Sequence, residues 1–146
     1  MKGVRAAKSE DREQICVLIT ALEETEIDRS AFFEIFEANR TDPAIHYFVY
    51  EEEGRVAGFA SLYVQRLLHH TAYVAEIQEL VVDRDRRGAG IGSQLFQAAK
   101  EAALDRGCIQ LEVCCNKKRK PSHGFYEAQG MKNDHYKFCM SLSNES

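Results

Sequence analysis

Three glycines occupy alternate positions in the stretch RRGAGIGSQLF at residues 86–96. A run typical of a buried strand, AEIQELVV, precedes them, and a run with helical spacing follows them. The first amides of a helix have no partner within the helix, so a glycine-rich turn at a helix start favours anion binding. Glycine also lets the backbone approach an anion without an intervening Cβ atom. The stretch therefore predicts a site for a phosphorylated ligand.

The spacing of these glycines narrows the choice of ligand. A Walker A loop ends in Gly-Lys-Ser/Thr, whereas Ser93 here follows Gly92 directly. A dinucleotide loop reads G-x-G-x-x-G, whereas Gly88, Gly90 and Gly92 give G-x-G-x-G. Both nucleotide loops are therefore poor matches, and the alternative to another phosphate ligand is a glycine-rich turn that binds nothing.

Apolar spacing and turn residues predict the elements that position this loop. Ser9 is expected to cap the first helix through its hydroxyl, and Glu53-Gly54 is expected to form a tight turn. The predicted strands are residues 4–7, 46–52, 55–65, 71–82, 108–115 and 135–142. The predicted helices begin near residues 9, 28, 93 and 121. The order βααβββαβαβ predicts an α/β fold with helices against a mixed sheet.

Length and charge limit the classes of protein to which the chain can belong. Its 146 residues suit a single domain spanning residues 1–146. A net charge of -4 argues against nucleic-acid partners, which require a basic face. No apolar run of membrane-spanning length and no apolar signal segment appear, so we expect a cytoplasmic protein without a membrane partner.

The glycine loop resembles a known signature. The segment from Arg87 to Gly92, RGAGIG, is similar to the R/Q-x-x-G-x-G/A motif of the GNAT superfamily of N-acetyltransferases. The resemblance continues along the chain: AEIQELVV is similar to the family's central strand, and PSHGFYEAQGM to its closing helix. It implies a single-domain GNAT fold with a mixed, mostly antiparallel sheet flanked by helices. It also implies acetyl-CoA as the co-substrate.

The resemblance assigns residues to acetyl-CoA. The main chain of Leu80, Val81 and Val82 is expected to pair with pantetheine, and Asn116 to contact the pantetheine arm. The loop residues expected at the pyrophosphate are Arg87, Gly88, Ala89, Gly90, Ile91, Gly92 and Ser93. We infer that KKRK at 117–120 meets the adenosine 3'-phosphate, the alternative being a solvated loop.

Acetylation of an amine requires a base, because an alkylamine with a pKa of about 10 is an ammonium ion at neutral pH. Glu76 matches the position that the resemblance gives to the base. Glu79 lies an odd number of residues away, so in a regular strand the two face opposite ways, and only a bulge would change this. We therefore expect Glu76 as the catalytic base and Glu79 on the other face or in a structural pair, with Glu79 also a candidate for substrate binding. The alternative is that both are solvent or ion-pair residues.

Tyr126, in HGFYEAQG, matches the tyrosine that the family uses to protonate the departing thiolate of coenzyme A. A tyrosine on a short helix facing a sheet is also a common core residue. The family's usual mechanism is direct transfer in a ternary complex, so an acyl-cysteine on Cys114 or Cys115 is not expected.

The acceptor is predicted from two further segments. ANRTDP at 38–43 and LLHHTAYVAEIQELVV at 67–82 resemble the GNAT enzymes that acetylate aminoalkylphosphonates. We therefore expect His69 and His70 to contact the substrate, and the resemblance admits a divalent metal as a further cofactor. In those enzymes a second histidine pair precedes an aromatic residue; here that place reads Arg29-Ser30, and Arg29 can also bind a phosphonate.

Other functions stay open at this stage. The acceptor amine is alternatively a polyamine, an aminoglycoside or a protein amine, since an acidic chain concentrates cations. A non-catalytic acyl-CoA-binding module is an alternative of another class, against which the presence of both Glu76 and Tyr126 argues. An exposed strand and an aromatic-rich second helix would permit a homodimer.

Overall fold

The structure is a computed structural model that describes residues 2–115 and 120–143. The chain divides into two compact units, residues 1–113 and 114–146, and each is described by itself. The single domain expected from the sequence stays a prediction. Within the described residues, none of the helices combines the length and the apolar character needed to cross a bilayer.

The first unit is built on a five-stranded sheet with the strand order β1-β2-β3-β4-β5. The first three pairings are antiparallel and the pairing of β4 with β5 is parallel, which confirms the mixed, mostly antiparallel sheet. The strands are β1 (Lys2–Ala6), β2 (Ile45–Glu52), β3 (Arg55–Leu67), β4 (Ala72–Val82) and β5 (Gln110–Val113). The predicted turn is also confirmed, because Glu53 and Gly54 have φ of 52° and 77°, as a two-residue type I′ hairpin requires.

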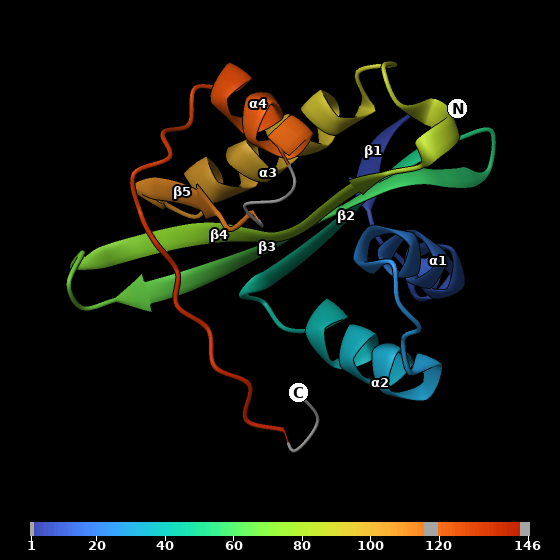
Figure 1. Ribbon diagram of the computed structural model, residues 1–146, viewed down its shortest axis with the longest axis horizontal. Coiled ribbons are helices and arrows are strands. Elements are labelled where there is room, and N and C mark those ends of the chain that lie inside the picture. Colours follow the sequence, from blue (N-terminus) through green and yellow to red (C-terminus); the bar gives the residue numbers. More distant parts are fainter. Residues whose placement is uncertain (1, 116–119, 144–146) are drawn as a thin grey trace. The chain divides into compact units, whose positions relative to one another are not determined.

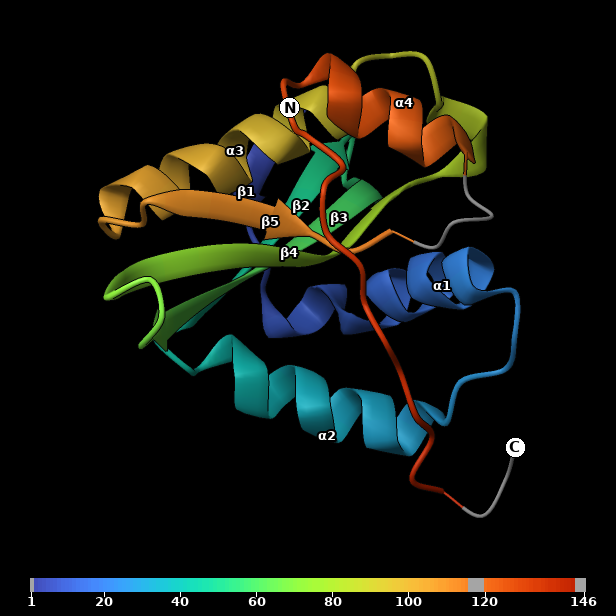
Figure 2. The ribbon, with the colours of Figure 1, turned by 60° about the vertical axis from the view of Figure 1, so that its left-hand side comes forward.

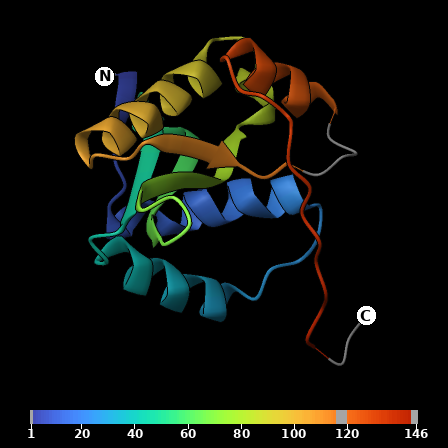
Figure 3. The same ribbon diagram turned by 90° about the vertical axis from the view of Figure 1, so that its left-hand side faces the viewer.

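Helices lie on both faces of this sheet (Figure 1, Figure 2). The helices of this unit are α1 (Arg12–Glu23), α2 (Arg29–Arg40) and α3 (Ile91–Asp105). On one face, Ile15 and Ile19 of α1 and Phe36 of α2 pack in one cluster with strand residues. On the other, Ile91 and Leu95 of α3 form a separate cluster. Figure 3 shows α1 and α2 on the side of the sheet opposite to α3. The sheet therefore separates two apolar layers.

The second unit contains α4 (Lys120–Ala128), but the strand expected at 135–142 is wrong. Its alternating apolar side chains are exposed, from 82% for Tyr136 to 95% for Phe138. A strand requires a neighbouring strand to complete its backbone hydrogen bonds, and no ladder of the described chain includes this segment. The described order is thus βααβββαβα, and the α/β class is confirmed without the last strand.

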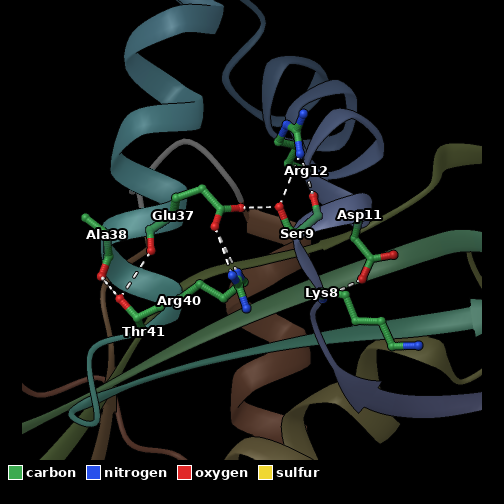
Figure 4. A network of polar contacts seen from close by, with 8 residues as sticks. All are labelled: Lys8, Ser9, Asp11, Arg12, Glu37, Ala38, Arg40 and Thr41. Carbon is green, nitrogen blue, oxygen red and sulfur yellow. Dashed lines mark hydrogen bonds and ion pairs between the residues drawn. The ribbon is translucent and has the colours of Figure 1, made fainter.

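Ser9 does not cap the first helix. A 3-10 turn, η1 (Ser9–Asp11), precedes α1, and the side chain that caps it is Asp11, which accepts from the Lys8 N–H at 2.7 Å. The Ser9 hydroxyl instead donates to Glu37 Oε1 at 2.6 Å, and Arg12 Nη1 donates to Ser9 Oγ at 3.2 Å (Figure 4). A charged carboxylate is a stronger acceptor than a neutral group, so the hydroxyl joins the start of α1 to α2. The capping prediction is therefore wrong, and Ser9 fixes the relative position of the two helices.

Close packing between β3 and α3 gives a first testable prediction. A Cβ atom added at Gly58 would lie 2.8 Å from Leu95 Cδ1, 3.0 Å from Ile91 Cγ2 and 3.2 Å from the Val81 carbonyl oxygen. We expect Gly58→Ala to lower the free energy of unfolding by about 1–3 kcal/mol, measured by urea denaturation. Gly124→Ala is the control, since nothing lies within 4 Å of its added Cβ and alanine favours a helix such as α4. Unchanged stability of Gly58→Ala would contradict this account of the packing.

Candidate active site

The glycine loop joins β4 to α3 and is open to its surroundings. Gly88 and Gly90 have φ of 86° and 79°, and Gly90 is the N-cap of α3. Residues with a Cβ atom rarely adopt φ angles in this left-handed region, so any residue other than glycine would be strained at these two positions. A Cβ added at Gly88 or Gly90 would meet nothing within 4 Å. The loop therefore gives a ligand free approach to the backbone at the first turn of α3, the arrangement that an anion requires.

The two arginines in front of the glycines differ in role. Arg86 forms an ion pair with Glu52 of β2, and Asp83 at the start of the loop pairs with Arg55 at 2.9 Å. These contacts tie the loop to the sheet. Arg87 is exposed. Within the described chain, Arg87 is therefore free of the contacts that give Arg86 a structural role, and its contact with an anion stays a prediction.

One edge of β4 lacks a partner strand beyond the middle of the strand. The ladder with β5 runs from Val74↔Gln110 to Ile77↔Val113, while β4 itself continues to Val82. The Asp83 N–H donates to the Ala57 carbonyl at 2.8 Å, toward β3. Since alternate residues of a strand direct their backbone groups to opposite edges, Leu80 and Val82 point to the edge that β5 leaves open. An extended ligand chain can pair with them there.

This alternation corrects one predicted contact. Val81 and Asp83 are two residues apart, so the backbone groups of Val81 point toward β3, with which Val81 is in register at Phe59. Its side chain is buried in the cluster beneath α1 and α2. Leu80 and Val82 thus suit the predicted pantetheine contacts, whereas the main chain of Val81 does not.

A bulge in β4 brings the two candidate carboxylates to one face. Ser61 of β3 is in register with Glu79 and Tyr63 with Glu76, and the register shifts between these pairs, which leaves Gln78 as the extra residue. Ser61 and Tyr63 are two residues apart on β3 and share a face. Their cross-strand partners therefore share it too. The expectation that Glu76 and Glu79 face opposite ways is wrong, because the extra residue reverses the alternation.

On this face, a cavity of about 290 Å³ lies between α2, the end of α1 and the sheet. Five of its twelve lining residues are aromatic. Phe32 and Phe36 of α2 have centroids 6.3 Å apart, Phe36 lies 5.2 Å from Tyr47, and Tyr47 lies 5.3 Å from Phe59. Glu79 also lines the cavity, so the bulge places this carboxylate at an apolar, aromatic pocket.

Asn39 organises one side of the cavity. Its Nδ2 donates to the hydroxyl oxygens of Tyr47 at 2.8 Å and Tyr63 at 3.1 Å. Burial raises the pKa of both phenols, so both are neutral at physiological pH. The sequence analysis gave none of the three a role of its own, although Asn39 lies in the ANRTDP segment, because only the fold brings the three together.

Glu79 is a partly buried carboxylate held by a serine. The Ser61 hydroxyl donates to a Glu79 carboxylate oxygen, and the Glu79 N–H donates back to Ser61 Oγ at 3.0 Å. Burial raises the pKa of Glu79, the hydrogen bond from Ser61 opposes the rise, and the charge of Glu23 adds to it. Among the residues that the structure describes, no cation lies within ion-pair distance of Glu79. Within the described part of the first unit, the pocket therefore contains an acid without a charge partner.

Three predicted substrate residues lie elsewhere. Arg29 is 3.9 Å from Glu13, and its guanidinium lies 5.2 Å from the Phe33 ring centroid. His69 and His70 are in the connection after β3, with ring centroids 4.3 Å apart. None of the three lines the cavity. The described residues contain no group of three or more His, Cys, Asp or Glu that could hold a metal ion.

The remaining predicted residues belong to the second unit. Tyr126 lies in α4. Asn116 and residues 117–119 lie outside the described residues, and Lys120 begins α4.

The open edge of β4 beside the glycine loop agrees with the family that the sequence matches. The profile of the Acetyltransferase (GNAT) family matches residues 12–131. The chain belongs to the GNAT family. A curated GNAT relative, the aminoalkylphosphonate N-acetyltransferase of Salmonella typhimurium, is 41% identical over 139 residues, which cover 95% of this chain and 90% of that protein. The glucosamine 6-phosphate N-acetyltransferase of Trypanosoma brucei brucei is 33% identical over 86 residues, 58% of this chain and 56% of that protein.

Solved structures share the GNAT fold. A transcriptional regulator from Bacillus halodurans superposes with a TM-score of 0.89 at 23% identity, covering 97% of this chain and all of that one. An aminoglycoside N-acetyltransferase in complex with CoA superposes with a TM-score of 0.87 at 16% identity, covering 98% and 96%. The protein is thus a GNAT acyltransferase that acetylates amines, and the family uses acetyl-CoA. The open loop and strand edge fit such a co-substrate.

The charge on Glu79 should reduce stability at neutral pH. Because its pKa is raised in the folded state, the folded protein holds the proton more tightly than the unfolded chain, and this stabilisation is lost as pH rises through the folded pKa. We expect Glu79→Gln to increase the free energy of unfolding at pH 7.5, with a smaller gain as the pH falls toward 4.5, measured by urea denaturation. Glu34→Gln, at an exposed position of α2, is the matched control and should change stability little. Lower stability of Glu79→Gln at neutral pH would refute this electrostatic account.

Proposed function

We propose that this GNAT enzyme transfers the acetyl group of acetyl-CoA directly to the primary amine of a small molecule, and that the amine is an aminoalkylphosphonate. The 41% identity to the Salmonella enzyme over nearly the whole chain is the observation that carries the choice of acceptor. The course of β4 supports the reaction type, because a single strand contributes both an open edge and two carboxylates on the cavity's face.

The loop and the strand edge bind the donor in this proposal. The main chain of Leu80 and Val82 pairs with pantetheine as an added strand would. The amides from Gly88 to Ser93, at the start of α3, hold the pyrophosphate, and Arg87 contributes charge. Asn116 contacts the pantetheine arm. Holding the thioester at the edge of β4 would bring its carbonyl close to the carboxylates of the same strand.

Two carboxylates handle the amine. Glu79 binds the ammonium group, and Glu76, on the same face of the sheet, accepts the proton directly or through a water molecule. The neutral nitrogen then attacks the thioester carbonyl carbon, so that a C–N bond forms and the C–S bond breaks. Tyr126 donates a proton to the departing thiolate, and the nitrogen loses its second proton to solvent.

The acceptor's anionic group requires cations, and the candidates lie outside the cavity. Arg29, His69 and His70 are the residues proposed to meet a phosphonate. A second class of acceptor, a polyamine, an aminoglycoside or a protein amine, is favoured by one observation: Asp28 and Glu79 line the cavity, and no described lysine, arginine or histidine does. Direct comparison of acceptors distinguishes the two classes.

Thiol release from acetyl-CoA across a panel of amines tests the proposal. The panel contains 2-aminoethylphosphonate, aminomethylphosphonate, spermidine and kanamycin, each with and without added divalent metal. We expect turnover of the phosphonates to exceed that of the cationic amines. Turnover of the cationic amines alone would retain the reaction and replace the acceptor. Binding of acetyl-CoA without release of thiol for any amine would instead support a non-catalytic acyl-CoA-binding module.

The proposed division of labour between the carboxylates predicts different kinetics. Glu76→Gln should lower kcat about 100-fold or more with little change in KM, because a general base acts in the transition state. Glu79→Gln should mainly raise KM for the amine, since it weakens ammonium binding. The pH profile of kcat/KM provides the second readout, and its rising limb should be lost only in Glu76→Gln. Loss of that limb in Glu79→Gln instead would reverse the two roles.

A further inference from the structure

The cavity beneath α2 has a polar end and an apolar body. Glu79 lines it from the sheet, and Phe32, Phe36, Tyr47 and Phe59 form a continuous aromatic wall with neighbouring centroids 5.2 to 6.3 Å apart. Its volume of about 290 Å³ is near the lower end of the range of small-molecule sites. The volume and lining suit a small ligand with one charged group and an apolar remainder.

The polar end favours a cation. Glu79 has its hydrogen bonds with Ser61, but the described residues provide no cation to offset its charge. Glu23 adds negative potential near it. A partly buried carboxylate gains most from an opposite charge within about 4–6 Å, and the ammonium group of an acceptor supplies one. Aromatic faces next to it add cation–π attraction.

The body of the cavity disfavours anions. The hydroxyl oxygens of Tyr47 and Tyr63 both accept from Asn39 Nδ2, so these oxygens already have a hydrogen-bond partner in the wall. The carboxylate of Asp28 accepts from the Ala31 N–H at 3.0 Å and caps α2. A phosphonate placed here would lie among aromatic rings and two carboxylates, where desolvation and repulsion both oppose it.

We propose that this cavity binds an alkyl or aryl group carried by the acceptor amine, whose ammonium group is held at Glu79. The inference rests on the proposed function and specifies the acceptor of that same site. An aminoalkylphosphonate satisfies it only when the carbon that bears the amine also carries an alkyl or aryl substituent, which enters the cavity while the phosphonate stays outside. Acceptors should therefore improve with the apolar surface attached to the amine.

The test compares ethylamine, butylamine, hexylamine and phenethylamine as acceptors with the full chain. Burial of one methylene group corresponds to about a fourfold gain in binding. We expect kcat/KM for hexylamine and phenethylamine to exceed that for ethylamine at least tenfold. Ala31→Trp, at an exposed lining position of α2, should remove this advantage, so that hexylamine and phenethylamine fall to within about twofold of the kcat/KM that ethylamine has in the same variant. Ser30→Trp, one position earlier and outside the lining, is the matched control and should keep the advantage.

Calorimetric titration with hexylamine separates this inference from the proposed function. Hexylamine binding that Ala31→Trp weakens at least tenfold and Ser30→Trp retains supports the cavity's role, even in a protein that acetylates none of the four amines. Equal kcat/KM along the alkyl series together with equal binding would overturn the inference while the acetyltransferase assignment stands. Equal losses in both tryptophan variants would also overturn it, because they would show a general effect on α2.

Discussion

One extra residue in β4, Gln78, determines how the two halves of the site meet. The ladder with β5 ends at Ile77, immediately before the bulge, and from there to Val82 the strand is paired with β3 only. A bulge redirects the side chains that follow it and increases the local twist. Here it turns Glu79 onto the face that carries the cavity, while Leu80 and Val82 present backbone groups to the open edge. One local irregularity thus combines a donor edge and an acceptor carboxylate in a single strand.

The fold places a destabilising group in this position and holds it with a large apolar framework. Glu79 is partly buried without a described cation, and its raised pKa shows that its surroundings oppose the charge. On the two faces of the sheet, fully buried residues such as Ile15 and Leu95 supply the opposing stabilisation, about 1.5–3 kcal/mol for each such side chain. Ser61, itself fully buried, fixes the carboxylate by two hydrogen bonds. The charge of Glu79 therefore lowers the stability of the folded protein and at the same time favours the binding of a cation.

The sequence predicted those features that depend on neighbouring residues. The strand, glycine loop and helix around Gly90 are encoded within about twenty residues by local turn and cap chemistry, and the hairpin at Gly54 likewise. The bulge at Gln78 has no local signature, so the parity of Glu76 and Glu79 was predicted wrongly. The cavity was missed because α2, β2 and β3 form it together.

Local sequence patterns also gave wrong predictions where contacts with distant residues determine the structure. Residues 135–142 alternate as a strand does, but alternation cannot provide the neighbouring backbone that a ladder requires. Ser9 has the type and position of a helix cap, and only the approach of Glu37 from α2 redirects its hydroxyl. For residues 135–142, no strand of the described ladders lies alongside to complete the predicted pairing. For Ser9, a contact distant in sequence overrides the local preference for a helix cap.

The placement of α2 and α3 on opposite faces of the sheet has a consequence for how such enzymes diversify. The rings that shape the cavity come largely from α2 and from strand positions facing it, whereas the glycine loop leads into α3 and is tied to β2 through Arg86. Substitutions in α2 can therefore reshape the acceptor cavity without displacing the backbone that receives the donor. In such a scaffold the choice of amine can be altered through a few side chains of one helix, while the main-chain contacts to the donor stay in place.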